Sequence, residues 1–196
     1  LDMMPDEEKI RKQSGGEDEY ELFELKRRYG YNYQYVRNTL QLNLGGGMFS
    51  EIGQLAGVYS TDWSLSPLFC DVDNDGWKDL FITNGIYRRA NDLDYVRFLT
   101  KGGQFALSPD KGGVPDKELY EQMPLYPKAN YIFRNNKDLT FTGKNDAWGF
   151  TVSSYSNGST YADLDNDGDL DLVVNNINEK AFLYRNNASG SLNNHF

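Results

Sequence analysis

The chain has 196 residues, with 29 acidic and 20 basic side chains and a formal net charge of −9 at pH 7. This balance argues against a nucleic-acid-binding protein, which needs a basic face to displace counterions, and against docking on an anionic membrane. No run of 18 apolar residues occurs, so we expect no direct insertion into a membrane. An aromatic content of 14% indicates a folded chain.

The chain has one cysteine and one histidine. Cys70 alone excludes an intrachain disulfide and a cysteine-based zinc cluster, and its place in an apolar run predicts a buried, unreactive thiol. His195 lies one residue from the end, which argues against a Ser-His-Asp or Cys-His mechanism. The sequence begins at Leu1 and shows no signal-peptide pattern, so we interpret it as a piece of a longer chain.

The first thirty residues differ in pattern from the rest of the chain. Residues 17–28 are highly charged, with Leu22, Leu25 and Tyr29 at helical spacing and Gly30 as the stop signal. We therefore predict an N-terminal helical or linker segment over residues 1–30.

Two stretches further along are near-copies of each other. Asp71–Ile82 reads DVDNDGWKDLFI, and Asp163–Val174, 92 residues later, reads DLDNDGDLDLVV. A partial third copy begins where Leu183–Asn187 repeats Ile132–Asn136 at an offset of 51. The domains that we predict are a first repeat over 31–86, a second over 130–180, and the start of another repeat or a linker over 181–196.

Short apolar runs within each repeat predict β-strands. They begin at Phe49, Asp79, Tyr131, Phe141, Asp171 and Phe182. Several short strands in a unit of about fifty residues fit one blade of a β-propeller. The sequence therefore predicts a mostly β fold: a partial β-propeller with two full blades and the start of a third, flanked by further repeats in a longer chain.

Residues 87–129 carry no repeat signature and predict a helical or loop insertion. One short helix should follow Asn91 and Asp92, and a second should run from Asp116 to Met123. The glycine pairs at 102–103 and 112–113 predict loops.

Each near-copy contains the pattern D-x-D-x-D-G-x-x-D followed by three apolar residues. Aspartates at alternate positions of a tight loop repel one another unless a cation lies among them, and oxygen ligands at this spacing suit Ca²⁺. Position 7 differs between the copies, so it is expected to contribute its backbone carbonyl. We predict two calcium sites with these ligands: Asp71, Asp73, Asp75, Trp77 and Asp79 in the first loop, and Asp163, Asp165, Asp167, Asp169 and Asp171 in the second.

The nearest alternative for these loops is an EF-hand, which needs a bidentate Glu at position 12. That position holds Ile82 or Val174, and the residues around it predict a strand in place of an exiting helix. Mg²⁺ is disfavoured because it prefers few carboxylates and retains several waters. A solvated Asp-Gly turn explains a single such sequence, but two copies in register favour a metal.

The repeats resemble the FG-GAP/VCBS repeats of integrin-α-like β-propellers. The similarity covers residues 31–86 and 129–190 and includes Asn130, Arg134, Asn135, Asn136, Phe141 and Gly149 ahead of the second loop. The ending 193–196 resembles the approach to an ASPIC/UnbV-type domain. The resemblance implies a calcium-stabilised propeller of about seven blades, located outside the cell, in the periplasm or at the cell surface, and used for binding.

We expect a binding module for a glycan or a protein, because long loops on rigid repeats often carry recognition. Aromatic residues that suit sugar stacking, although blade core is the plainer interpretation of each, are Trp63, Trp77, Trp148, Tyr87, Tyr95, Tyr120 and Tyr126. One alternative is a propeller-based polysaccharide lyase or glycosidase, with Asp92, Asp94 and Glu118 as free carboxylates; another is a purely structural scaffold. The sequence favours a role without catalysis.

Overall fold

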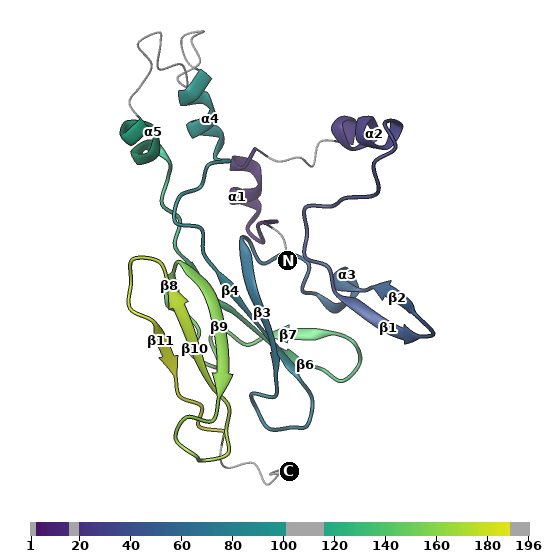
Figure 1. Ribbon diagram of the computed structural model, residues 1–196, viewed down its shortest axis with the longest axis vertical. Helices are drawn as coiled ribbons and strands as arrows, with labels where there is room; N and C mark the ends of the chain where they lie inside the picture. The colour runs from purple at the N-terminus through teal and green to yellow at the C-terminus, as the bar shows by residue number, and fades with distance from the viewer. Residues whose placement is uncertain (1–2, 16–19, 101–115, 189–196) are drawn as a thin grey trace. The chain divides into compact units, whose positions relative to one another are not determined.

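The computed structural model describes residues 3–15, 20–100 and 116–188 (Figure 1). The chain divides into two compact units. The first unit comprises residues 1–4, 37–85 and 127–196, and the second comprises 5–36 and 86–126. All strands of the described residues lie in the first unit. The predicted mostly β class is therefore confirmed, and within the described residues no sheet closes on itself.

The middle of the first unit is a four-stranded antiparallel sheet whose strands follow chain order (Figure 1). Its strands are β3 (Ser64–Cys70), β4 (Asp79–Asn84), β6 (Tyr131–Asn135) and β7 (Phe141–Gly143). Before it in the chain lie β1 (Gln41–Gly45), β2 (Met48–Glu51) and helix α3 (Gly53–Ala56). After it come β9 (Ser156–Ala162), β10 (Asp171–Asn176) and β11 (Phe182–Tyr184), which form a three-stranded sheet, while β5 (Lys128–Ala129) pairs with β8 (Ser153–Ser154).

The strands recur at the spacing found in the sequence. β9 and β10 have the bounds of β3 and β4 shifted by 92 residues, and strands occur at all six predicted starting points. The sequence repeat, however, is out of phase with the sheets. Its first copy supplies β1 and β2 to one sheet and β3 and β4 to the next. For this reason the described residues contain one four-stranded sheet between a hairpin and a three-stranded sheet.

The hairpin between β1 and β2 turns through three glycines. Gly45, Gly46 and Gly47 all have positive φ angles, between 60° and 80°, which a residue without Cβ adopts without strain. The side chain of Asn43 accepts a hydrogen bond from the Gly45 amide at 2.8 Å, which fixes the entry to the turn.

The centre of the middle sheet is buried on both faces, and every residue of β4 is buried. Because strand side chains alternate between faces, Phe81 joins one core cluster while Leu80 and Ile82 join the other. The first cluster fills the space between the middle and three-stranded sheets and contains Cys70, Phe81, Ile132, Phe150, Leu172 and Val174. The second contains Ala56, Val58, Leu80, Ile82 and Phe133. Cys70 is only 2% exposed, and burial raises its pKa to about 12, in agreement with the predicted inert thiol.

The neighbouring sheets approach closely at the end of β4. A Cβ atom placed on Gly85 would lie 2.3 Å from the backbone nitrogen of Ser156. Only glycine fits at this point, and the contact holds the last residues of β4 against the start of β9.

The second unit contains the helices outside the repeats. They are α1 (Glu8–Gln13), α2 (Tyr20–Arg28), α4 (Leu93–Thr100) and α5 (Asp116–Gln122). The predicted helices are thus confirmed, α2 over the described part of its range, and α4 starts where the Asp92 carboxylate caps the amides of Asp94 and Tyr95. The glycine pairs at 102–103 and 112–113 lie outside the described residues.

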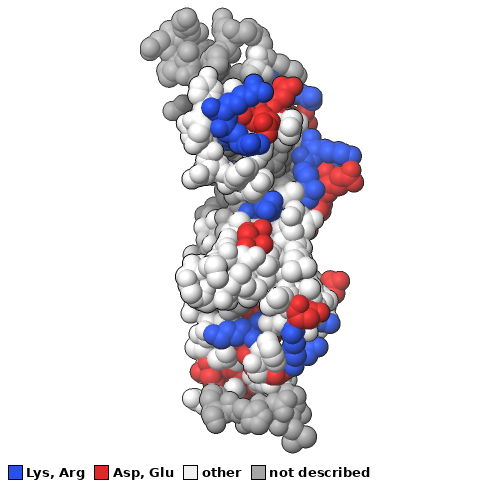
Figure 2. Space-filling view, turned by 90° about the vertical axis from the view of Figure 1, so that its right-hand side faces the viewer, with Lys and Arg blue, Asp and Glu red and all other residues white. Residues whose placement is uncertain are grey.

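None of the described helices is both long and apolar enough to cross a membrane. On the face of the molecule shown in Figure 2, acidic side chains lie beside basic ones.

Candidate metal centre

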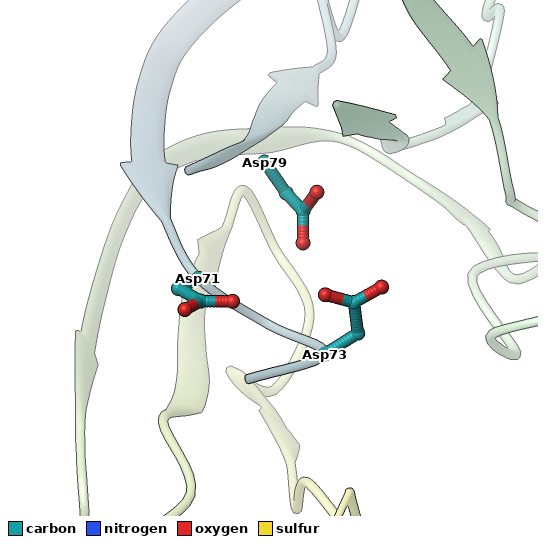
Figure 3. A group of neighbouring side chains, drawn as sticks. All are labelled: Asp71, Asp73 and Asp79. Carbon is teal, nitrogen blue, oxygen red and sulfur yellow. The ribbon is translucent and has the colours of Figure 1, made fainter. Parts of the chain in front are cut away.

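The first acidic loop connects β3 to β4 and brings three of its aspartates together. Asp71 lies just after β3, Asp73 lies in the loop, and Asp79 is the first residue of β4. One carboxylate oxygen from each lies within 4.8 Å of the other two. Figure 3 shows the three side chains pointing toward a common space.

Backbone geometry produces this convergence. The Asp71 carboxylate accepts hydrogen bonds from the amides of Asp75 at 3.0 Å and Gly76 at 2.8 Å, so the loop folds back over its first residue. Asn74 and Gly76 have φ angles of 54° and 85°, in the region that Asn and Gly tolerate best.

The second loop repeats this conformation between β9 and β10. Asp163 accepts the amides of Asp167 and Gly168 at 3.2 and 3.1 Å. Asn166 and Gly168 have φ angles of 61° and 91°. Carboxylate oxygens of Asp163, Asp165 and Asp167 lie within 4.8 Å of one another.

The aspartate at position 9 of each loop is buried. Asp79 is 1% exposed and accepts the amides of Val72 at 3.1 Å and Asn135 at 2.9 Å. Burial, reinforced by the negative charges of Asp73 and Asp75, raises the pKa of Asp79 to about 6, although the two backbone hydrogen bonds act in the opposite direction. In the second loop Asp171 accepts two amides in the same way, from Leu164 at 3.1 Å and Asn186 at 2.8 Å.

The other predicted ligands lie outside these two groups of three. Asp75 accepts the Trp77 amide at 3.0 Å and faces basic side chains. Asp169 is 1% exposed, and its carboxylate accepts a hydrogen bond from Asn74 of the first loop. The side chain of Trp77 is 49% exposed. The ligand roles of all ten residues, including the carbonyl of position 7, stay predictions.

Sequence reasoning missed the basic side chains that face the loops. Arg134 donates to Asp73 at 2.7 Å and to Asp75 at 3.0 Å, and Lys137 lies 3.2 Å from Asp75. Arg185 plays the matching part in the second loop, 2.7 Å from Asp165 and 3.6 Å from Asp167. The available signal was the Arg-Asn-Asn sequence, which occurs at 134–136 and again at 185–187. Its arginine contacts the loop carboxylates and its first asparagine donates to the position-9 aspartate.

The first loop fits a hard cation by three observations. Its converging donors are all carboxylate oxygens, the donor type that Ca²⁺ prefers. Oδ1 of Asp73 is buried and has no hydrogen-bond partner among the described residues. Among the described residues, the carboxylates of Asp71 and Asp79 accept hydrogen bonds only from backbone amides. Two of the four aspartates in the first loop therefore have no basic partner there.

The remaining candidate residues are dispersed. Tyr95 is buried and Trp148 packs against the first core cluster, whereas Trp77 and Tyr120 are about half exposed, and Trp63, Tyr87 and Tyr126 are partly buried. Among the free carboxylates, Asp92 caps α4, Asp94 pairs with Arg97 at 3.2 Å, and Glu118 is exposed.

Comparison with protein families gives one match: residues 125–174 match the FG-GAP-like repeat. The matched stretch contains the second loop and runs from just before β5 into β10. It supports the predicted resemblance to FG-GAP repeats. A comparison with curated proteins finds no significant match. The resemblance of residues 193–196 to the start of an ASPIC/UnbV-type segment lies outside the described residues and stays a prediction.

Proposed function

We propose that each loop binds one Ca²⁺ ion and that the two ions stabilise a segment of a β-propeller built from FG-GAP repeats. The observation that carries the proposal is the group of three converging carboxylates in the first loop, one of which is fully buried at the start of β4. Bound Ca²⁺ would supply positive charge at this point. Asp71, Asp73 and Asp79 would hold it in the first loop, and Asp163, Asp165 and Asp167 in the second.

The electrostatic cost of the loops without a cation supports this role. Two unit charges about 5 Å apart repel by about 3 kcal/mol at an effective dielectric constant of about 20. The raised pKa of Asp79 is the local sign of this repulsion and of burial. A divalent cation would offset the repulsion between the carboxylates and would favour the ionised form of Asp79. Because it binds only the folded loop, it would also stabilise the fold.

The partial propeller is supported by the packing of the sheets. The central strands of the middle sheet are covered on both faces, as a blade is covered by its two neighbours. The outer sheets carry exposed apolar side chains, including Leu44, Met48 and Phe49 on the hairpin and Leu183 on β11. Further repeats of a longer chain would cover these side chains.

A location outside the cytosol and a binding role complete the proposal. Calcium loops of extracellular modules bind in the range of about 10⁻⁴–10⁻³ M, and such sites need a calcium-rich compartment. We propose that the protein acts outside the cell, in the periplasm or at the cell surface, as a binding module for a glycan or a protein. Exposed aromatic side chains such as Trp77 and Tyr120 are of the type that contacts such ligands.

Calorimetric titration with Ca²⁺ tests the metal sites. The wild-type chain should bind two ions, and Asp73→Asn and Asp165→Asn, which alter position 3 of each loop, should each remove one. Asp146→Asn, an exposed aspartate outside both loops, is the matched control for the loss of one charge. Absence of binding heat together with an unchanged melting temperature in EDTA would overturn the proposal.

The binding role needs a separate measurement. The calcium-loaded chain is applied to a glycan array and to immobilised extracellular proteins, beside Trp77→Ala and Tyr120→Ala. Retention that one of these substitutions removes would support the binding module. Release of shortened saccharides from a polysaccharide by the wild-type chain would instead indicate an enzyme.

A further inference from the structure

The side chain at position 7 has different surroundings in the two loops. In the first loop Trp77 is 49% exposed, whereas in the second Asp169 is 1% exposed. Oδ1 of Asp169 accepts a hydrogen bond of 2.6 Å from Nδ2 of Asn74 in the first loop. Its other oxygen, Oδ2, is buried and has no hydrogen-bond partner among the described residues. A buried carboxylate of the second loop thus faces the first loop.

A second connection joins the two loops through Asn186. Its backbone amide donates to Asp171 at 2.8 Å, and its side-chain amide donates to the carbonyl of Val72 at 2.7 Å. The amide of Val72 in turn donates to Asp79 at 3.1 Å. Three hydrogen bonds therefore link the two buried position-9 aspartates, one from each loop.

We propose that Asp169 is a positioning residue for the first loop, so that the two loops form one unit for two cations. Asp169 belongs to the second loop in sequence, where its backbone carbonyl is the predicted position-7 ligand, while its side chain acts on the first loop. The inference rests on the proposed binding of cations by both loops. It adds that the first site is incomplete without the second repeat.

The physical basis is the place of Asn74 between two carboxylates. Asn74 lies between Asp73 and Asp75 with a φ angle of 54°, so its backbone conformation contributes to the directions in which these two side chains leave the loop. The Asp169 carboxylate holds the Asn74 amide by a charge-assisted hydrogen bond. Its buried negative charge also favours a cation in the adjacent loop, because a charge is poorly screened away from water.

Terbium luminescence tests the inference on the full chain. Tb³⁺ replaces Ca²⁺ at oxygen sites and emits when a nearby tryptophan is excited, and Trp77 places such a sensitiser in the first loop. Asp169→Asn should weaken the Tb³⁺ affinity reported by Trp77 about tenfold, because it replaces a charged hydrogen-bond acceptor with a neutral one and removes a negative charge next to the first loop. The chain also contains Trp63 and Trp148, so the part of the sensitised emission that Trp77→Phe removes is the part that reports on the first loop, and Asp146→Asn should leave the affinity unchanged.

A matched pair of asparagines gives a second test that keeps the backbone conformation. Asn74 and Asn166 occupy position 4 of their loops with φ angles of 54° and 61°, which glycine adopts freely. Asn74→Gly should weaken the Trp77-reported affinity several-fold, whereas Asn166→Gly should leave it unchanged. This pair decides the question if Asp169→Asn fails to fold.

The outcomes separate the inference from the function on which it rests. If the wild-type chain binds neither Tb³⁺ nor Ca²⁺, the proposed function and this inference are both overturned. If both loops bind but Asp169→Asn and Asn74→Gly leave the Trp77-reported affinity unchanged, only the inference is overturned. A loss of affinity in Asp169→Asn that Asn74→Gly reproduces and Asn166→Gly does not would support it.

Discussion

The loops at 71–79 and 163–171 share one backbone conformation but lie in different surroundings. In both, position 1 accepts the amides of positions 5 and 6, and position 9 is buried and accepts two more. The first loop faces Arg134 and Lys137 and contacts the second loop through Asn74. The second loop faces Arg185 alone among the described basic residues, and Asp163 and Asp165 are exposed.

This difference separates what the repeat determines from what its neighbour determines. The aspartates at positions 1 and 9, which are common to the copies, accept the internal hydrogen bonds, and the shared Gly at position 6 donates one of them. Position 7 is one of the three positions that differ between the loops, and its side chain is half exposed in the first loop and buried in the second. Loops in such repeats are therefore equivalent in conformation but need not be equivalent in affinity or stability.

The largest expected effect concerns position 9, where the two loops should behave alike. Asp79→Ala and Asp171→Ala each leave two partly buried backbone amides without their carboxylate acceptor, and each lost bond to a carboxylate costs about 1.5–3 kcal/mol. Urea unfolding in EDTA should show a loss of about 3 kcal/mol or more for either variant. Asp79→Asn and Asp171→Asn, which keep one acceptor oxygen, should lose less. Markedly unequal losses for the two alanine variants would break the equivalence of the loop interiors.

The next effect is the pH dependence contributed by Asp79. Its pKa in the folded, cation-free chain is about 6, above the ordinary value of 3.8, so its ionised form is disfavoured by folding. As the pH falls from about 7 to about 5, protonation of Asp79 should raise the stability of the chain in EDTA and lower its affinity for Ca²⁺. Melting temperatures and calcium titrations across this range provide the measurement.

Two variants identify the source of that pH dependence. Asp79→Asn should remove the Asp79 contribution from both the stability and the calcium titration. Asp171→Asn, its counterpart in the second loop, leaves Asp79 intact and should retain that contribution. Identical pH profiles for the wild type and Asp79→Asn would contradict the assignment.

Much of the fold was predictable because residues close together in the sequence determine most of the strands and helices. The apolar runs after Asp79 and Asp171 predicted β4 and β10, and the cap at Asp92 predicted α4. Strand β3 was harder to find, because Ser64–Cys70 contains a proline and alternates only weakly. Strand β9 has few apolar residues, and its pairing with β10 determines it. The sequence also did not predict that each copy of the repeat contributes strands to two different sheets, because this depends on which strands pair.

The candidate site was predictable as a set of acidic residues but not as a set of contacts. The D-x-D-x-D-G-x-x-D pattern specified the loops because its glycine and asparagine positions have local conformational causes. Arg134 lies 55 residues beyond Asp79, with residues 87–129 between them, so spacing alone did not connect it with the loop. The bond from Asn74 to Asp169 spans 95 residues and exists only because the two sheets pack together.

A smaller effect is expected from the arginines, and here the loops should differ. Arg134 contacts Asp73 and Asp75 with a 41% exposed side chain, while Arg185 is 65% exposed and its second contact is longer. In EDTA, Arg134→Met should lose about 1 kcal/mol and Arg185→Met about half of that, because exposed pairs are weak. With Ca²⁺, Arg134→Met should bind more tightly at the first loop, since the arginine and the ion compete for the same carboxylates.

Urea unfolding and calcium titration of both arginine variants provide the measurement. Equal losses in EDTA would remove the distinction between the two loops at this point. A weaker calcium affinity in Arg134→Met would mean that the arginine orients the carboxylates and does not compete for them.

The smallest effect is expected at position 7 of the first loop. Trp77 lines an open pocket together with Phe69 and Leu139 and is half exposed, so Trp77→Ala should change the free energy of unfolding by less than about 0.5 kcal/mol. Its backbone carbonyl, the group expected to contribute to the site, is retained in this variant.

Asp169→Ala, at the same position of the second loop, should cost more because it leaves Asn74 without its acceptor. Urea unfolding in EDTA compares the two variants, and a calcium titration of Trp77→Ala tests the carbonyl role. If that titration lost one ion, the tryptophan side chain would itself be part of the site, and the two loops would differ in how they hold the metal as well as in what surrounds them.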